Sequence, residues 1–372
     1  MKMASRIAPK APIWACALTA LALSPVAAKQ VEVIGNLKWT YSVDGNSVCI
    51  DNVAAEQGGR IEGIVQVPAS FGGGAYAVTA LGYRTFAGAE YLQEVKLPST
   101  IRSVGAYCFN GCKRMAAVDL PASVTEIHES AFKDCAGLRS VTLNEGLVSI
   151  GDSAFRGCAS LTSLALPATV RGIGQCAFIG TSLEAVELPD SVKTLGQEAF
   201  SGCGSLETVA IGKGLETIPY RAFSGCANLR SVTIKDGNLD AVGEYSFSEC
   251  KRLVAIKLPP LVQSICPSAF RSCAGLRSVT LNEGLVSIGD SAFRGCTSLT
   301  SLALPATVSE IGPCAFIGTS LVAVELPDSV KTLGQETFAG CGSLETVVIG
   351  KGLAVLPYRA FSGCANLRSV TV

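Results

Sequence analysis

The sequence is poor in the side chains on which enzymes and metal sites depend. Its 372 residues include a single histidine, His128, and none of its 16 cysteines belongs to a Cys-x-x-Cys pair. Closed zinc sites use such pairs, and hydrolytic triads or Cys–His dyads need a histidine beside the nucleophile. No phosphate-binding loop occurs, and the carboxylates form no repeated pair suited to acid–base catalysis. We therefore expect no enzyme activity, no cofactor and no metal site, and we interpret His128 as a solvated surface residue.

Charge is also scarce. Charged residues make up 16% of the chain, and 30 basic residues balance 30 acidic ones. Proteins that bind nucleic acid or anionic membranes usually carry a basic stripe, and the sequence shows none. We therefore expect neither as a partner. The hydrophobic share of 48% is typical of a buried, folded chain and not of a disordered one.

What the sequence does contain is a repeat. A phenylalanine, often preceded by alanine, recurs at steps of 22, 23 or 24 residues. It occurs thirteen times, at Phe86, Phe109, Phe132, Phe155, Phe178, Phe200, Phe223, Phe247, Phe270, Phe293, Phe316, Phe338 and Phe361. A period of this length is typical of solenoids, in which each repeat is one unit stacked on its neighbours. The pattern predicts the architecture and does not identify a ligand.

Each repeat consists of a short strand and a turn-rich half. In the copy at 138–160, Leu138, Val141 and Leu143 end in a period of two, as expected for a strand with one buried face. A proline often follows and ends the strand, because proline has no N–H for the ladder. The Ile-Gly-x-x-Ala-Phe half is too short for a helix. It predicts an extended or 3₁₀ segment, and Gly157 is predicted to supply the closing turn.

The full motif is Cys-x-x-Leu-x-x-Val-x-Leu-Pro followed by Val-x-x-Ile-Gly-x-x-Ala-Phe-x-x-Cys, and it extends over residues 80–372. It resembles the BspA-like class of leucine-rich repeats. The resemblance implies a curved, right-handed solenoid of about 13 coils with a parallel β-sheet on the concave face. It also implies an exported protein, secreted or displayed on a cell surface, of a kind often linked to adhesion.

Residues 1–28 have the pattern of a signal peptide. Lys2, Arg6 and Lys10 precede an apolar run at 13–23, and small residues at 26–28 provide a cleavage site. The apolar run is too short for a membrane anchor. We therefore expect export to the cell surface, the medium or the periplasm, with no membrane insertion after cleavage.

Residues 29–79 lack the repeat, and we predict that they form an N-terminal β cap. Two strand-like segments, 37–43 and 47–50, flank Asp44-Gly45-Asn46, a typical hairpin turn. A solenoid needs such a cap because its first coil would otherwise expose apolar surface. The alternative is a small ligand-binding module that uses Trp39 and Tyr41.

Part of the solenoid is duplicated. Residues 136–234 match 274–372 at an offset of 138 residues and differ at 12 of 99 positions. The offset equals six repeats, so a six-coil block was copied. Most differences, such as Arg171 against Ser309 and Glu184 against Val322, fall at positions predicted to lie outside. This is expected if packing restrains the interior while the surface changes.

Ten cysteines share one place in the repeat, three residues after the phenylalanine. They are Cys112, Cys135, Cys158, Cys203, Cys226, Cys250, Cys273, Cys296, Cys341 and Cys364. Stacked coils bring such residues about 5 Å apart, within disulfide range, and export brings oxidising conditions. Parallel side chains suit that bond badly, so we favour buried thiols and leave partial disulfide formation open. We expect Phe155, Cys158, Phe293 and Cys296 to be structural, and Cys176 and Cys314 to repack two coils that carry threonine instead.

The strand residues between the inward Val and Leu are predicted to face outward on the concave sheet. Most of them are small, and none is aromatic. The candidate binding residues on this face are Glu94, Lys96, Asp119, Thr142, Glu187, Lys257, Thr280 and Glu325. A face without Trp, Tyr or Arg anchors predicts weak, extended or multivalent contact, or simply a solvated sheet. A second candidate patch lies in the other half of the coils and contains Tyr83, Tyr220, Arg221, Tyr245, Tyr358 and Arg359.

The preferred hypothesis is an exported, non-catalytic module that binds a protein or glycan on a surface. Two alternatives remain. The protein is either a self-assembling envelope spacer whose C-terminal edge strand pairs with another chain, or the targeting arm of a larger protein truncated after Val372. Both alternatives start from a repeat that stops in mid-unit at Val372. An uncovered strand edge there would invite pairing with another chain.

Overall fold

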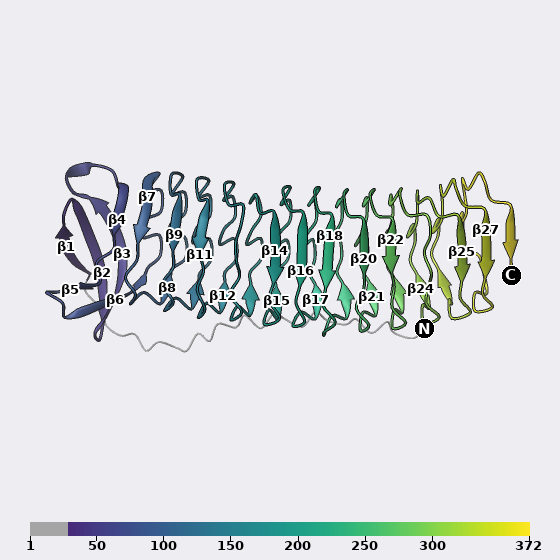
Figure 1. Ribbon diagram of the computed structural model, residues 1–372, viewed down its shortest axis with the longest axis horizontal. Coiled ribbons are helices and arrows are strands. Elements are labelled where there is room, and N and C mark those ends of the chain that lie inside the picture. Colours follow the sequence, from purple (N-terminus) through teal and green to yellow (C-terminus); the bar gives the residue numbers. More distant parts are fainter. Residues whose placement is uncertain (1–28) are drawn as a thin grey trace, which may run out of the picture.

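A computed structural model describes residues 29–372, so the predicted signal peptide lies outside the described residues. The coils stack in a single row from the N-terminal cap to the last strand (Figure 1). Nearly all regular structure is β-strand, and the one helical segment among the described residues is a 3₁₀ turn, η1 (Glu56–Gly58), in the cap. Within residues 29–372, no helix has the length and apolar character needed to cross a bilayer. The predicted solenoid of about thirteen coils is confirmed.

The cap is built on an antiparallel hairpin, as the Asp44-Gly45-Asn46 signal predicts. Gly45 at the turn has a φ of +58°, and Asp44 pairs with Ser47 across it. The strands of the cap are β1 (Gln30–Ile34), β2 (Leu37–Asp44), β3 (Ser47–Ala55) and β5 (Ser70–Phe71). Trp39 is fully buried and contacts both Phe71 and Phe86, with ring centroids 6.2 Å apart in each case. The hairpin aromatics therefore cover the first ring of the solenoid.

The first sheet contains the Val-x-Leu strands, joined in parallel between successive coils. It is divided into three sections, and the strands in each pair in register except for a shift at Gly63/Ile64 between β4 and β7. The strands are β4 (Glu62–Gln66), β7 (Tyr91–Lys96), β9 (Ala117–Asp119) and β11 (Ser140–Thr142); then β14 (Ala185–Leu188), β16 (Thr208–Ile211), β18 (Ser231–Ile234), β20 (Ala255–Lys257) and β22 (Ser278–Thr280); then β25 (Ala323–Leu326), β27 (Thr346–Ile349) and β28 (Ser369–Thr371).

Two equivalent segments, 161–166 and 299–304, separate the three sections. The coil that follows each segment is one residue shorter than its neighbours. In each segment the first leucine (Leu161 or Leu299) is fully buried, but the later ones, such as Leu164 and Leu302, are only half-buried. The shorter coil therefore coincides with the loss of regular ladder pairing.

The second sheet is a ladder of mostly two-residue strands that end at a buried Ile, Val or Leu, most often followed by Gly. It begins on β3 of the cap and runs in two sections. The strands are β6 (Tyr76–Leu81), β8 (Ser103–Val104), β10 (Glu126–Ile127), β12 (Ser149–Ile150), β13 (Gly172–Ile173) and β15 (Thr194–Leu195); then β17 (Thr217–Ile218), β19 (Ala241–Val242), β21 (Ser264–Ile265), β23 (Ser287–Ile288), β24 (Glu310–Ile311) and β26 (Thr332–Leu333). The half-coil predicted as extended or 3₁₀ is therefore extended only in this short strand, and the Gly-x-x-Ala-Phe part that follows is a series of turns, with bonds such as Arg156 N–H to Ser153 O at 3.1 Å.

Parallel pairing with the solenoid begins inside the segment assigned to the cap. Strand β4 pairs with β7 of the first sheet, and β6 pairs with β8 of the second sheet. Residues 62–81 therefore already form one coil. The Cys-x-x-Leu opening is absent there, so the repeat motif reveals only the later half of this coil, which leads from β6 to Phe86.

The interior is a stack of phenylalanine rings. All twelve neighbouring pairs from Phe86 to Phe361 are nearly parallel, with ring centroids 4.9–5.6 Å apart. Free aromatic pairs prefer offset or edge-to-face contacts, so the coil spacing imposes this arrangement. Between the rings, the backbone N–H of one Phe donates to a carbonyl of the next coil, as from Phe155 to Ala177 at 2.8 Å.

Candidate binding surfaces

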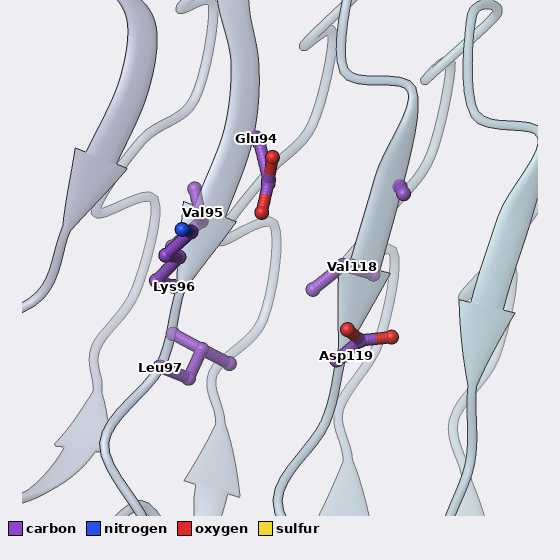
Figure 2. Close-up of a pocket in the computed structure, with 7 residues that line it drawn as sticks. Glu94, Val95, Lys96, Leu97, Val118 and Asp119 are labelled. Carbon is purple, nitrogen blue, oxygen red and sulfur yellow. The ribbon is translucent and has the colours of Figure 1, made fainter.

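The first-sheet face consists of the outward residues of the first sheet. All eight candidate binding residues lie on it, with Glu94 half-buried and the other seven exposed. On β7 and β9, the outward side chains of Glu94, Lys96 and Asp119 surround a shallow hollow of about 230 Å³ (Figure 2). In the next coil, the Thr142 hydroxyl donates to Asp119 Oδ1 at 2.5 Å. Four of the eight predicted residues therefore lie on three neighbouring strands.

The other four predicted residues do not join this group. Glu187, Lys257 and Thr280 belong to the second section of the first sheet, and Glu325 belongs to the third. The irregular segments 161–166 and 299–304 lie between the sections. The eight residues therefore share a face without forming a single site. Alternation along a strand predicts the direction of a side chain, but it does not predict the separation between charged residues on different strands.

The predicted structural residues Phe155, Cys158, Phe293 and Cys296 are fully buried. Each of the ten ladder thiols donates a hydrogen bond to the carbonyl oxygen of the preceding coil's Phe, at 3.0–3.3 Å; Cys158 Sγ, for example, lies 3.1 Å from Phe132 O. Burial raises the pKa of Cys158 and Cys296 to about 12. These thiols are held as protonated donors and are unsuited to act as nucleophiles.

Two of the three coils without a ladder cysteine carry threonine at that place, and the first coil carries Ala89. The hydroxyls of Thr181 and Thr319 donate to the Phe carbonyl of their own coil, at 2.9 and 3.0 Å. Cys176 and Cys314 do not enter the ladder. They occupy turn positions with φ of +56° and +57° and are half-buried. The expectation that these cysteines repack the interior is therefore wrong, because threonine alone fills the place.

His128 takes a position where most coils have the glycine of Ile-Gly. Its side chain is 44% exposed, its Nε2 lies 3.0 Å from Ser103 Oγ, and the same atom lies 3.6 Å from Glu126 Oε2. No cysteine is among these partners. Within residues 29–372, no cluster of three or more His, Cys, Asp or Glu side chains is arranged to hold a metal ion. The histidine is a polar surface residue with a neighbouring carboxylate.

The structure also brings together arginines and tyrosines that are far apart in the sequence. The guanidinium groups of Arg60 and Arg114 lie 4.4 and 4.6 Å from the centre of the Tyr91 ring. Arg60 and Tyr91 border a groove of about 530 Å³ between the cap and the first coils. The sequence carries no signal for this contact, because Arg60 lies in the segment without the repeat motif.

Known protein families and solved structures share this arrangement of coils. The family model described as "BspA type Leucine rich repeat region" matches residues 75–184, 171–285 and 263–372. No curated protein matches the chain. A solved leucine-rich repeat protein from Bacteroides ovatus is 26% identical, with a TM-score of 0.61, and the alignment covers 91% of this chain and 94% of that one.

A second solved structure, the pneumococcal vaccine antigen PcpA, is 24% identical with a TM-score of 0.54. That alignment covers 92% of this chain and 87% of that one, and it shows likeness of fold. The matched family is a repeat family and not a family of enzymes. With the motif present from 80 to 372, the stacked coils described above and a family match over most of its length, the chain belongs to the BspA-type leucine-rich repeat family.

Proposed function

We propose that this protein is an exported, non-catalytic recognition module that binds a surface protein or glycan through its first-sheet face. Membership in a leucine-rich repeat family supports a binding role, because solenoids present long, regular surfaces to partners. Export is supported by the charged, apolar and small-residue pattern of residues 1–28.

The observation that carries the proposal is the charge on β7 and β9. Glu94, Lys96 and Asp119 face outward around one hollow, and none of them belongs to an ion pair within the described chain. Asp119 accepts a hydrogen bond from Thr142, but charges without an oppositely charged partner on a sheet are available to a complementary ligand. Apart from separate charges such as Glu187, Lys257 and Glu325, the outward residues on the rest of the face are mostly small, which favours several weak contacts over one deep site.

Charge reversal tests this site. The purified protein and its Glu94→Lys/Asp119→Lys variant are applied to arrays of immobilised glycans and purified extracellular proteins. We expect binding to fall by about tenfold or more, because reversed charge repels a complementary ligand. The matched control is Glu216→Lys, an exposed carboxylate outside the first-sheet face. Unchanged binding by the double variant, with circular dichroism identical to the parent, contradicts the proposal for this face.

Self-association is the second candidate, favoured by the outer strands of the described chain. Strand β1 pairs with β2 alone, and its Val31 and Val33 are about half exposed. Strand β28 likewise pairs only with β27, and its Val370 is 46% exposed. Light scattering after size-exclusion chromatography, with and without an added polar capping repeat, tests this function. A monomer in both forms rules it out, whereas association that capping abolishes supports it.

A further inference from the structure

One turn position repeats through the solenoid with a strained backbone. The residue two places before each ladder Phe has a φ between +52° and +58° in all thirteen coils, and none of these residues is glycine. We call these residues the turn row. A positive φ costs non-glycine residues conformational free energy. Its presence in every coil shows that the turn requires this backbone conformation.

The identities along the turn row follow a six-coil period. In order, they are Arg84, Tyr107, Ser130, Ser153, Cys176, Glu198, Arg221, Tyr245, Ser268, Ser291, Cys314, Glu336 and Arg359. The order Arg, Tyr, Ser, Ser, Cys, Glu therefore occurs twice and begins a third time. A further tyrosine precedes each of the three arginines, at Tyr83, Tyr220 and Tyr358. Each arginine therefore has a tyrosine directly before it, and we call each such group, with the neighbouring turn-row tyrosine where there is one, a Tyr–Arg constellation.

This recurrence extends beyond the closely matching blocks. Arg84 and Tyr107 precede residue 136, and Tyr245 lies between 234 and 274. In this diverged stretch, outward residues differ between equivalent coils, such as Glu94 against Ser231 and Lys96 against Thr233. The tyrosines and arginines are nevertheless the same. Packing does not account for the retention of Tyr83 and Tyr358, which are 63% and 61% exposed, whereas Tyr107, Tyr220 and Tyr245 are half-buried.

The geometry of the constellation also recurs. Tyr83 and Tyr107 meet edge to face with centroids 5.8 Å apart, and Tyr220 and Tyr245 do the same at 6.0 Å. The Arg221 guanidinium lies 5.1 Å from one ring centre and 5.3 Å from the other. Such stacking holds the guanidinium plane while its N–H donors remain free at the edges.

The middle constellation opens onto a groove of about 470 Å³. Arg221, Tyr245 and Arg271 line it, together with serines of successive coils such as Ser201 and Ser224. Among residues 29–372, neither Arg221 nor Arg271 belongs to an ion pair. Glu249 is the single carboxylate among the lining residues of this groove. The groove therefore offers two free cations, an aromatic face and hydroxyl groups.

From these observations we propose that the Tyr–Arg constellations bind a polysaccharide that carries carboxylate groups, such as a uronic acid polymer. Arginine pairs with carboxylates through two parallel hydrogen bonds, and the serine hydroxyls match the hydroxyls of a sugar. The apolar face of a pyranose ring packs on tyrosine, as other apolar groups do. A periodic polymer also suits sites that recur every six coils, roughly 30 Å apart at about 5 Å per coil.

The test measures binding of the purified protein to polygalacturonate, with dextran as the neutral polymer and poly-glutamate as the acidic peptide. The key variant is Arg84→Gln/Arg221→Gln. Its matched control is Arg156→Gln/Arg294→Gln, which removes the same charge from exposed positions three residues after the turn row. We expect polygalacturonate to bind at least tenfold more tightly than dextran, with about a tenfold loss in the key variant and little change in the control. Chains longer than roughly 30 Å are expected to bind more tightly than shorter ones.

Three results overturn the proposal: no binding to polygalacturonate, equal loss in both double variants, or poly-glutamate binding as tight as polygalacturonate. The inference rests on the proposed binding function, but the two fail separately. If Glu94→Lys/Asp119→Lys abolishes binding to an array ligand while polygalacturonate does not bind, the constellation proposal fails and the first-sheet function stands. If only the Arg84→Gln/Arg221→Gln variant loses binding, the turn row replaces the first-sheet face as the recognition surface.

Discussion

One fifteen-residue sequence occurs twice in this chain, in two different surroundings. Residues 219–233 lie in the middle of the solenoid, and the identical residues 357–371 lie in the last described coil. Phe223, Cys226 and Leu229 are fully buried, whereas Phe361, Cys364 and Leu367 are half-buried. Because the residues are the same, the difference comes from the neighbouring coils, chiefly the coil that follows residues 219–233 and has no counterpart after 357–371 in the described chain. Burial in a solenoid is a property of neighbouring units, and one repeat does not complete its own core.

The largest expected effect is the loss of an interior ring. Phe155→Ala leaves a cavity between two stacked phenylalanines, and we expect it to lower the free energy of unfolding by ~3–5 kcal/mol. Phe361→Ala removes the same side chain from a half-buried site, so we expect a loss of only ~1–2 kcal/mol. Urea denaturation of both variants measures the difference. Equal losses would show that the following coil does not determine the energy, and a Phe155→Ala variant as stable as the parent would overturn the coil register.

A glycine pair tests how closely the coils approach each other. A methyl group added at Gly196 would lie 2.2 Å from the backbone nitrogen of Gln175 in the preceding coil, whereas one at Gly204 meets nothing within 4 Å. We expect Gly196→Ala to destabilise the protein by ~1–3 kcal/mol, because backbone has to move. Gly204→Ala is expected to be neutral or slightly stabilising. Thermal unfolding compares the two variants, and similar melting temperatures would refute tight stacking of the second sheet.

The buried thiols predict sensitivity to alkali. Burial raises the pKa of Cys158 and Cys296 from 9.0 to about 12, so the folded protein holds these protons more tightly than the unfolded chain does. Their contribution to stability is complete below about pH 9 and is lost as the pH rises from about 9 towards 12. We expect the urea midpoint to fall over this range, and less steeply in Cys158→Ala. An identical slope in that variant would exclude the thiol as a cause.

The smallest effect concerns thiol reactivity in the two copies. Burial raises the pKa of both Cys226 and Cys364, but only Cys226 is fully covered. We therefore expect Cys364 to react with a thiol reagent such as DTNB well before Cys226. Tryptic peptides from the two copies are identical, so the assay uses Cys226→Ala and Cys364→Ala variants. Only the second should lose a fast-reacting thiol, and the reverse outcome would contradict the burial difference.

Much of the fold is predictable from the sequence because one repeat is read thirteen times. The inward Phe and Cys positions, the outward strand residues and the hairpin at Asp44 follow from alternation and turn chemistry. The interruptions at 161–166 and 299–304 do not, because they depend on pairing between whole coils. The first strand of the first coil, β4, is also missed, since it is defined by pairing with β7 and not by its own motif.

The binding surfaces were less predictable. Alternation gives the direction of Glu94 and Asp119, but their grouping with Lys96 around one hollow requires the register between β7 and β9. The contact of Arg60 and Arg114 with Tyr91 joins residues with no sequence relationship. By contrast, the Tyr–Arg period along the turns is readable once the coils are aligned on their phenylalanines, because equivalent positions in a stack are neighbours in space.

The hydrogen bonds between coils run in both directions. At the turns, the N–H of Phe155 donates forward to Ala177, while in the second sheet the N–H of Gly151 donates back to Ile127. Every coil therefore presents the same backbone donors and acceptors to the coil before it, and the same set to the coil after it. A block of six coils inserted into such a stack makes the same hydrogen bonds with the coils on either side of it. This interchangeability explains how a gene could lengthen the protein by 138 residues in one step and still encode a continuous column.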